Sequence, residues 1–357
     1  MPTGAPAGAG RPRAPDWGAV RTADFTYDLP QAAIAQSAVE PRSAARLLVA
    51  DGLADHRFYD LPGLLRPGDL VVVNRTRVRR ARLRGHREGS GGRVEALLLR
   101  PAAEGRWEAL VRPARRLRPG EEIHFGEIVA TVMGDPAGGE VLLALDTGEV
   151  PLDEALARWG EVPLPPYFKG RLDDPERYQT VYAAGTGSAA APTAGLHFTP
   201  EVLDALGGRG IELAAVDLDI GVDTFRPIAA AHLEDHEMHR EGYCVPEETA
   251  AAVAAARERG GRVVAVGTTV VRALESAAAP TGEVRPGAGA TGLFITPGYS
   301  FRVVDLLVTN FHVPGSTLVV LVAAFMGEAW REAYRVALER GYRFLSFGDA
   351  MLAARTR

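Results

Sequence analysis

The spacing of apolar residues changes after Pro62-Gly63, and this change constrains the possible fold more than any other feature of the sequence. In the segment that follows, short apolar runs are separated by Gly and Pro turns, a spacing typical of a small antiparallel barrel. From Pro151 onward, helical and strand patterns alternate, as in an α/β domain. The sequence therefore predicts an α/β main domain, residues 23–64 and 151–357, interrupted by a small antiparallel β-barrel domain at 65–150. Barrel strands are expected at 70–73, 94–99, 107–111, 122–132 and 141–145.

Helix signals in the main domain are clearest where proline opens a segment. Thr199-Pro200 is typical of a helix start, and Pro246 opens a segment that Gly260 closes. These signals predict helices over 200–209 and 246–259, with further helices over 317–325 and 328–340. Strands are expected at 211–218, 262–266, 293–295, 301–309 and 343–347.

Composition narrows the class of protein. With 357 residues and 46% hydrophobic content, the chain is long enough for two domains. Its one cysteine, Cys244, excludes an intrachain disulfide and fits a reducing compartment, so a cytoplasmic location is expected. No apolar run approaches the ~20 residues of a membrane span. Residues 1–22 lack the apolar core of a signal peptide and are expected to form a disordered tail.

Charge is distributed unevenly along the chain. The segment from Arg66 to Gly120 contains 15 arginines and five acidic residues, whereas the whole chain carries a net charge of −5. An excess this local favours a polyanionic partner such as RNA, although charge runs often mark only a solvated face. Trp107 and Phe125 could stack on bases but are expected in the barrel core. The expected RNA contacts are Arg75, Arg77, Arg79, Arg80, Arg82, Arg115 and Arg116.

The stretch 187–199, GSAAAPTAGLHFT, has the composition of a site loop. Thr193 offers a hydroxyl, His197 can titrate near neutrality, and Gly195 allows close approach of a ligand. The loop leads into a helix start, which favours anions. The alternative is a tight connector in which His197 only hydrogen-bonds the backbone.

Two further motifs are ambiguous. His232, His236 and His239 would share one face of a helix and could bind zinc. Equally, these histidines and the neighbouring acids, Asp235 and Glu241 among them, could form a hydrogen-bonded acid–base cluster. The sequence GAGATG at 287–292 fits GxGxxG, but no strand leads into it and no helix follows, so a dinucleotide site is not expected. By contrast, Gly267-Thr268-Thr269 lies between an apolar strand and a helix and does suit an anion.

Several segments together resemble the S-adenosylmethionine:tRNA ribosyltransferase-isomerase family of queuosine biosynthesis. They are DFTYDLPQAAIAQ (24–36), NRTRVRRARL (74–83), PLPPY (163–167) with ERYQTVY (176–182), the 187–199 loop, DHEMHRE (235–241), RVVAVGTTVVRALES (262–276), PGYSF (297–301), TNFHVPGST (309–317) and FLSFGDAML (344–352). The resemblance implies an α/β domain with an inserted β-barrel. It also implies transfer of the ribosyl part of S-adenosylmethionine to 7-aminomethyl-7-deazaguanine in tRNA, giving an epoxycyclopentane ring and releasing adenine and methionine.

The resemblance also implies roles for individual residues. Proton transfer is assigned to His197, His236 and His239, with Asp235 and Glu241 orienting them or contacting the aminomethyl cation. S-adenosylmethionine is the substrate, no metal is required, tRNA is the partner, and a monomer is expected. The residues expected to bind S-adenosylmethionine are Thr193, Gly195, Asp219, Thr268, Thr269, Asn310, His312 and Asp349.

The chain departs from the family pattern at two places. Asp219 stands where the family usually has histidine, and Arg79-Arg80 stand where an apolar residue and proline are usual. A carboxylate mainly accepts hydrogen bonds where an imidazole can donate one. Two alternatives therefore stay open: a divergent, paralogous enzyme that uses S-adenosylmethionine on a nucleoside or other small-molecule acceptor, and a non-catalytic RNA-binding protein.

Overall fold

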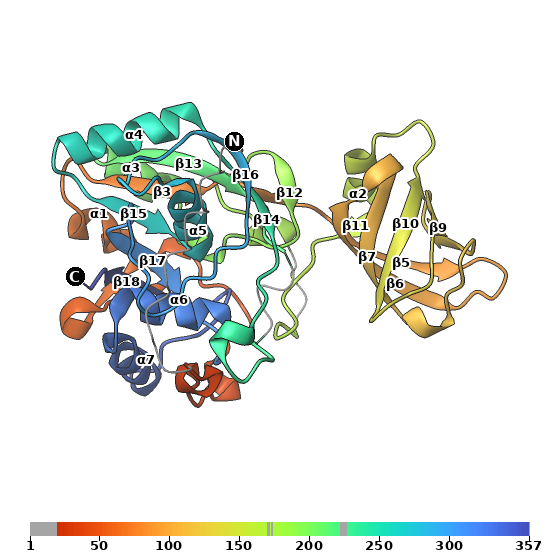
Figure 1. The fold of residues 1–357 in the computed structure, drawn as a ribbon, viewed down its shortest axis with the longest axis horizontal. Coiled ribbons are helices and arrows are strands. Elements are labelled where there is room, and N and C mark those ends of the chain that lie inside the picture. The colour runs from red at the N-terminus through yellow and green to blue at the C-terminus, as the bar shows by residue number, and fades with distance from the viewer. Residues whose placement is uncertain (1–19, 170–171, 173, 222–226, 357) are drawn as a thin grey trace, which may run out of the picture.

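The computed structural model describes residues 20–169, 172, 174–221 and 227–356. These residues form a large lobe and a small lobe joined by narrow connections (Figure 1). Residues 1–19 of the expected disordered tail lie outside the described residues. No helix within the described ranges combines the length and apolar character needed to cross a bilayer.

The large lobe is built on one mixed sheet, in which the central strands β13, β3, β15 and β17 run parallel to one another. Strands β17 and β18 pair antiparallel. Because the four central strands are parallel, their carboxyl ends lie along one edge of the sheet. In spatial order the strands are β16 (Gly287–Thr291), β14 (Glu241–Val245), β13 (Glu212–Leu218), β3 (Leu70–Asn74), β15 (Val263–Val266), β17 (Leu306–Asn310), β18 (Ala350–Ala354), β1 (Arg46–Val49) and β2 (Ala54–Arg57).

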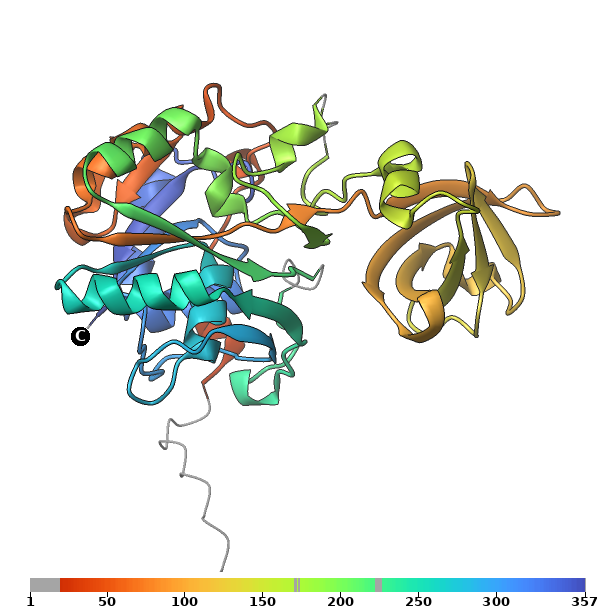
Figure 2. The ribbon, with the colours of Figure 1, turned by 90° about the horizontal axis from the view of Figure 1, so that it is seen from above.

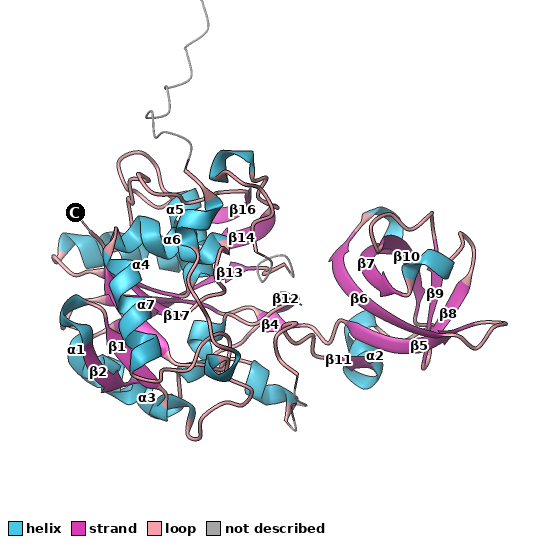
Figure 3. Cartoon of the chain, turned by 90° about the horizontal axis from the view of Figure 1, so that it is seen from below, coloured by secondary structure: helices cyan, strands magenta, loops and turns pink. Residues whose placement is uncertain are grey.

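Helices cover both faces of this sheet, and β3, β15 and β17 are buried along their whole length (Figure 3). In β3, Leu70 and Val72 pack into one core layer, whereas Val71 and Val73 pack into the other. The first layer includes side chains of α4 (Glu247–Glu258), α5 (Thr268–Ala277), α6 (Thr317–Met326) and α7 (Ala329–Glu339). The second includes those of α1 (Leu61–Leu64) and α3 (Pro200–Gly208).

The small lobe is an antiparallel barrel, closed by pairing of its first strand with β8 (Figure 2). Trp107 and Phe125 are buried in its core, as expected from their strand context. The barrel strands are β5 (Arg82–Arg87), β6 (Arg93–Pro101), β7 (Arg106–Arg112), β8 (Glu122–Phe125), β9 (Ile128–Val132) and β10 (Glu140–Asp146), with α2 (Leu152–Trp159) and β11 (Gly160–Glu161) after them.

The boundaries of the barrel differ from the expected 65–150. Residues 70–73, expected in the barrel, belong to β3 in the middle of the main sheet. At the other boundary, β11 pairs with β5, so the barrel continues to Glu161. A short parallel pairing of β4 (Arg77–Val78) with β12 (Thr186–Ser188) lies between the lobes. A short apolar run cannot indicate which domain it enters, and this explains the difference.

Most predicted main-domain elements are found within one or two residues of their expected bounds, but the strand expected at 301–309 begins only at Leu306. Residues 293–295 and 343–347 are not strands, and Leu345 has a φ of +70°, which a strand cannot accommodate. Strand β18, an alanine-rich segment that favours helix by propensity, was not predicted. The histidines from 232 to 239 do not share a helical face either. Their segment forms only a 3₁₀ turn (Leu233–Asp235), because His232 and Leu233 pair instead with the backbone of residues 20 and 21.

Candidate functional site

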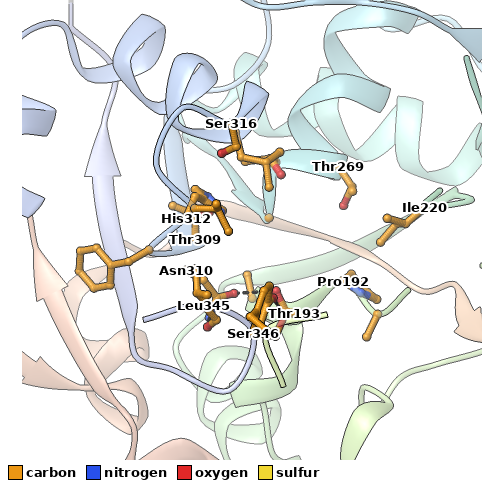
Figure 4. A pocket seen from close by; sticks show the side chains of 18 residues that line it. Pro192, Thr193, Ile220, Thr269, Thr309, Asn310, His312, Ser316, Leu345 and Ser346 are labelled. Carbon is orange, nitrogen blue, oxygen red and sulfur yellow. Dashed lines mark hydrogen bonds between the residues drawn. The ribbon is translucent and has the colours of Figure 1, made fainter. Parts of the chain in front are cut away.

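A cavity lies where the carboxyl ends of β15 and β17 meet the 190–194 segment and the loop before α6 (Figure 4). Its empty volume is about 590 Å³, which includes space open to solvent. Figure 4 shows the labelled side chains surrounding a common space. The lining residues are Tyr167, Ala191, Pro192, Thr193, Ala194, Ile220, Gly267, Thr268, Thr269, Thr309, Asn310, Phe311, His312, Val313, Ser316, Leu318, Leu345 and Ser346.

The first polar wall is the start of α5. Gly267 joins β15 to this helix with a φ of +90°, a conformation that glycine adopts without strain. The turn places Thr268 and Thr269 on the cavity at the helix N-terminus, where free backbone N–H groups favour an anion. The amide of Asn74, at the end of β3, lies 3.5 Å from Thr269 Oγ1 and is held by both backbone groups of Leu218.

The second polar wall follows β17. Asn310 accepts a hydrogen bond from Thr193 Oγ1 (2.9 Å), which links the strand end to the 187–199 loop. Ser316 caps α6 by accepting from Val319 N at 3.4 Å, so a second helix N-terminus opens on the cavity. Two helix starts and several hydroxyls therefore surround a space whose remaining walls are largely apolar.

His312 is held as a neutral imidazole. Burial lowers its pKa to about 3, and its Nε2 lies 2.9 Å from Thr309 Oγ1. Its backbone N–H donates to Tyr334 Oη at 3.2 Å, and its carbonyl accepts from Tyr27 Oη. A histidine that stays neutral can recognise a ligand by one hydrogen bond, but it cannot supply an imidazolium proton near neutral pH.

The third wall contains residues that sequence reasoning missed. Leu345 adopts the left-handed conformation, uncommon for a leucine, and its neighbour Ser346 hydrogen-bonds the Tyr167 hydroxyl. Tyr167 belongs to the proline-rich segment that follows the barrel, and Ile220 directly follows Asp219. The resemblance included FLSFGDAML, but it did not indicate which of its residues would reach the cavity.

A charged cluster lies beside the cavity, next to Ile220. Glu241 is buried, accepts from Gly221 N (2.9 Å), and forms an ion pair with Arg272 of α5. His239 Nε2 lies 3.3 Å from Glu241 Oε1. Burial alone would raise the pKa of Glu241, but the hydrogen bond to His239 and the charge of Arg272 outweigh it and hold that pKa below its ordinary value. Glu241 is therefore an anion that can orient His239.

Three other predicted residues lie around this cluster. His236 packs edge-on against Phe294 (ring centroids 5.2 Å apart), and burial followed by the charge of His239 lowers its pKa. Asp219 lies against Gly187, where an added Cβ would come within 2.2 Å of Oδ1. Burial raises the pKa of Asp219, and Asp217 and Glu241 raise it further against Arg79. Asp235 is exposed.

His197, Gly195 and Asp349 do not line the cavity. His197 is buried and stacked on Phe58, with Nδ1 3.1 Å from Ala194 O and Nε2 2.9 Å from Gly348 O. Burial lowers its pKa despite these two carbonyl groups. Asp349 accepts from the backbone N–H groups of Arg46 (2.9 Å) and Arg343 (2.8 Å). Both side chains thus hold loops together next to the cavity.

Gly195 allows the side chain of Tyr182, rather than a ligand, to approach the backbone closely. A Cβ on it would lie 2.1 Å from Tyr182 Oη, so no larger residue fits without a shift of the tyrosine or the backbone. Its position lets the short 3₁₀ helix of Thr193–His197 pack against Tyr182. The glycine predicted for ligand approach therefore serves packing in the described structure.

The predicted RNA-binding arginines divide into two groups. Four pair with acids of the protein: Arg75 with Asp217 (3.1 Å), Arg77 with Glu176 (2.6 Å), Arg79 with Asp153 (3.0 Å) and Arg82 with Glu95 (3.5 Å). Arg80 donates to Ala157 O. Arg115 and Arg116 are exposed after β7, and within the described ranges neither forms an ion pair. These two are the predicted arginines most available to an RNA.

Potential metal ligands gather away from the cavity. Among the described residues, one group of three has ligand atoms within 4.8 Å of one another: Glu88, Glu122 and His124 on the barrel. The predicted histidines 232, 236 and 239 do not form such a group in the described part of the chain. The acid–base reading of that segment is the one its geometry favours, through His239 and Glu241.

Comparison with known proteins identifies the family. Residues 22–353 match the family described as queuosine biosynthesis protein. The chain belongs to this family. The S-adenosylmethionine:tRNA ribosyltransferase-isomerase of Moorella thermoacetica is 53% identical over 341 residues, covering 93% of this chain and 99% of the relative. That of Gloeobacter violaceus is 54% identical over 338 residues, covering 93% and 95%.

A solved structure extends the family likeness to the fold. The crystal structure of S-adenosylmethionine tRNA ribosyltransferase from Thermotoga maritima is 38% identical to this chain, with a TM-score of 0.53. The match covers 92% of this chain and 99% of the solved one. The family predicted from the sequence and the α/β domain with an inserted barrel are both confirmed.

Proposed function

We propose that this chain is an S-adenosylmethionine:tRNA ribosyltransferase-isomerase. It transfers and isomerises the ribosyl part of S-adenosylmethionine onto 7-aminomethyl-7-deazaguanine in tRNA, and it releases adenine and methionine. The observation that carries the proposal is near-full-length identity above 50% to enzymes of that name. A cavity with hydroxyl-bearing walls at the carboxyl edge of the sheet supports it.

The cavity suits the parts of S-adenosylmethionine. The N-termini of α5 and α6 favour its carboxylate, and the hydroxyls of Thr268 and Thr269 can bond ribose oxygens. Apolar walls, with Ile220 and Leu345 among them, suit the adenine ring, and neutral His312 can give it one hydrogen bond. Asn310, fixed by Thr193, can contact either polar group.

His239 is the histidine best placed to transfer protons in this reaction. The sulfonium acidifies the adjacent 5′ carbon, so a base must remove a proton there, and adenine must gain one as it leaves. His239 is half-buried and oriented by Glu241, which is a pairing typical of general acid–base catalysis. Glu241 also places negative charge near a cationic substrate.

His197 receives a positioning role in this proposal. Both of its ring nitrogens face carbonyl groups, of Ala194 beside the cavity and of Gly348 in the 343–349 loop. Because burial lowers its pKa, the ring is neutral near pH 7 and its one N–H donates to one of these carbonyl groups, while the ring packs between the two segments that supply Thr193 and Ser346. Exchange of a proton with substrate would require this contact to open.

An adenine-release assay tests the proposed function. The protein is incubated with S-adenosylmethionine and tRNA carrying the deazaguanine precursor, and free adenine is measured by chromatography. Adenine is expected only when the modified tRNA is present. Release with the free nucleoside alone would instead support a small-molecule acceptor, and RNA binding without adenine would support a non-catalytic protein.

The remaining expectations follow from a tRNA substrate. We propose that the chain works in the cytoplasm, where tRNA is modified, and that it needs no metal ion. Activity should therefore persist after treatment with a chelator. The monomer stays a prediction that gel filtration can test.

A further inference from the structure

A second, smaller cavity lies next to the first, behind the 343–348 loop. Its empty volume is about 290 Å³, and Ser346 lines both cavities. One wall is the segment around the 3₁₀ turn Arg42–Ala44, and another is the turn Pro175–Tyr178. The buried ring of His197 lies at the wall between them, since it contacts Ala194 of the first cavity and Gly348 of the second.

Three arginines line this small cavity: Arg42, Arg177 and Arg343. Arg42 donates to two carbonyl groups, of Gln179 (2.5 Å) and Glu176 (2.8 Å), rather than to a carboxylate. Arg177 donates to Val39 O at 3.1 Å. These carbonyl contacts fix the two guanidinium groups in place while leaving their charge in the cavity wall.

Arg343 leaves one donor unused. Its Nη1 donates to Ser37 O (3.0 Å), whereas its buried Nη2 has no hydrogen-bond partner among the described residues. The nearest acid to that atom, Asp349 Oδ1, is 3.8 Å away. A buried guanidinium donor without a partner is unfavourable, and a small shift of Arg343 towards the cavity that it lines would let this donor meet an acceptor there.

Among the described residues, no acidic side chain lines the cavity beside the three arginines. Glu40 pairs with Arg177 at 2.7 Å, but the Glu40 side chain is 70% exposed. Asp349 is buried, and both of its oxygens already accept backbone N–H groups. Consistent with close like charges, burial and then Arg177 lower the pKa of Arg42. Glu40, Asp174 and Glu176 oppose this effect from outside the cavity, whereas the charged side chains among its described lining residues are arginines.

We propose that this cavity binds an oxyanion of a substrate, beside the transfer cavity. Guanidinium forks and an unpaired donor match the geometry of a phosphate or a carboxylate. This inference rests on the proposed function, which supplies two sources: a backbone phosphate of the tRNA next to the target nucleoside, and the methionine carboxylate of S-adenosylmethionine. The phosphate is the expected source, because two helix N-termini in the first cavity already suit the carboxylate.

The test uses Arg177→Gln and Arg343→Gln in the full chain. Arg335→Gln is the matched control, since Arg335 lies on the surface of α7, where its ion-pair partners among the described residues are Glu332 and Glu339. Precursor tRNA affinity is measured by filter binding over a range of salt concentrations, and S-adenosylmethionine affinity by calorimetry. Thermal melts with and without inorganic phosphate check folding and probe the anion directly. Arg177→Lys keeps the charge and should lie between wild type and Arg177→Gln.

Each outcome has a defined meaning. If the phosphate is bound here, each Gln variant weakens tRNA binding about tenfold or more and lowers the salt slope by about 0.7. It also loses the phosphate-induced rise in melting temperature and keeps its affinity for S-adenosylmethionine. Loss of S-adenosylmethionine affinity alone would assign the site to the carboxylate. Unchanged affinities in folded variants, with wild type releasing adenine, would overturn the oxyanion site but not the proposed function.

Discussion

The buried ion pair of Glu241 and Arg272 gives a prediction whose size follows from the structure. Their side chains are 2% and 7% exposed. Arg272→Met keeps an apolar chain of similar length but removes the cation paired with the Glu241 carboxylate, which keeps Gly221 N and His239 among its partners. Removing one partner of a buried pair typically costs 3–5 kcal/mol, so we expect a loss of about 4 kcal/mol at neutral pH.

The loss should depend on pH in a defined direction. Without Arg272, burial dominates and the folded pKa of Glu241 rises above its unfolded value. The folded state then binds the extra proton, so the variant recovers stability as pH falls towards the unfolded pKa and loses it as pH rises. Wild type, whose Glu241 pKa is lowered, has the opposite dependence at this site.

Urea unfolding followed by far-ultraviolet circular dichroism measures the effect, with the main-domain transition analysed separately if the barrel unfolds alone. Two controls are needed. The double variant Glu241→Gln/Arg272→Met removes both charges and should recover most of the loss. Arg335→Met breaks an exposed pair and should change stability by less than about 0.5 kcal/mol. A loss below about 1 kcal/mol for Arg272→Met, independent of pH, would refute the reasoning.

Three further predictions concern the site and the RNA. His239→Gln should lower kcat at least 100-fold while S-adenosylmethionine affinity changes little, and an unchanged kcat would remove it from catalysis. The free energy of unfolding of the wild type should fall as pH drops below about 6.5, because His312 is protonated only in the unfolded state. The expected loss at about pH 5.5 is about 1.4 kcal/mol. His312→Gln should flatten this pH dependence in urea titrations. The double variant Arg115→Gln/Arg116→Gln should lower the salt slope of tRNA binding by about 1.4, whereas Arg75→Gln, which breaks an internal pair, should leave it unchanged. Equal slopes for these two variants would contradict the assignment.

The residues that sequence reasoning brought to one site are those that follow parallel strands. Thr268 comes directly after β15 and Asn310 ends β17, and the carboxyl ends of these strands lie side by side. Thr193 could be added because its loop is small-residue-rich. In each case, a local signal and the rule of parallel sheets are sufficient to predict proximity.

Other parts of the site depend on the path of the chain in space. Tyr167 and Ser346 meet although 179 residues separate them, and neither stands in a pattern that indicates a strand end. His197 has the residue type of a catalyst, but its two carbonyl contacts cannot be read from spacing. Likewise, a run of arginines gives net charge and does not reveal that Arg77 pairs with Glu176. These contacts join residues that are distant in sequence, so they could be identified only from the tertiary structure.

The position of β3 in the chain also determines the order in which the two lobes can fold during synthesis. The barrel is one continuous stretch, from Arg82 to Glu161, and all of its strand pairs lie within it. Strand β3 precedes it, yet its two neighbours are residues 212–216 and 263–265. On the ribosome, the barrel can therefore fold while β3 is still unpaired. The two strands that pair with β3 are translated about 50 and 100 residues after the barrel ends. A very apolar strand is exposed throughout that interval, which makes the nascent large lobe a substrate for chaperones.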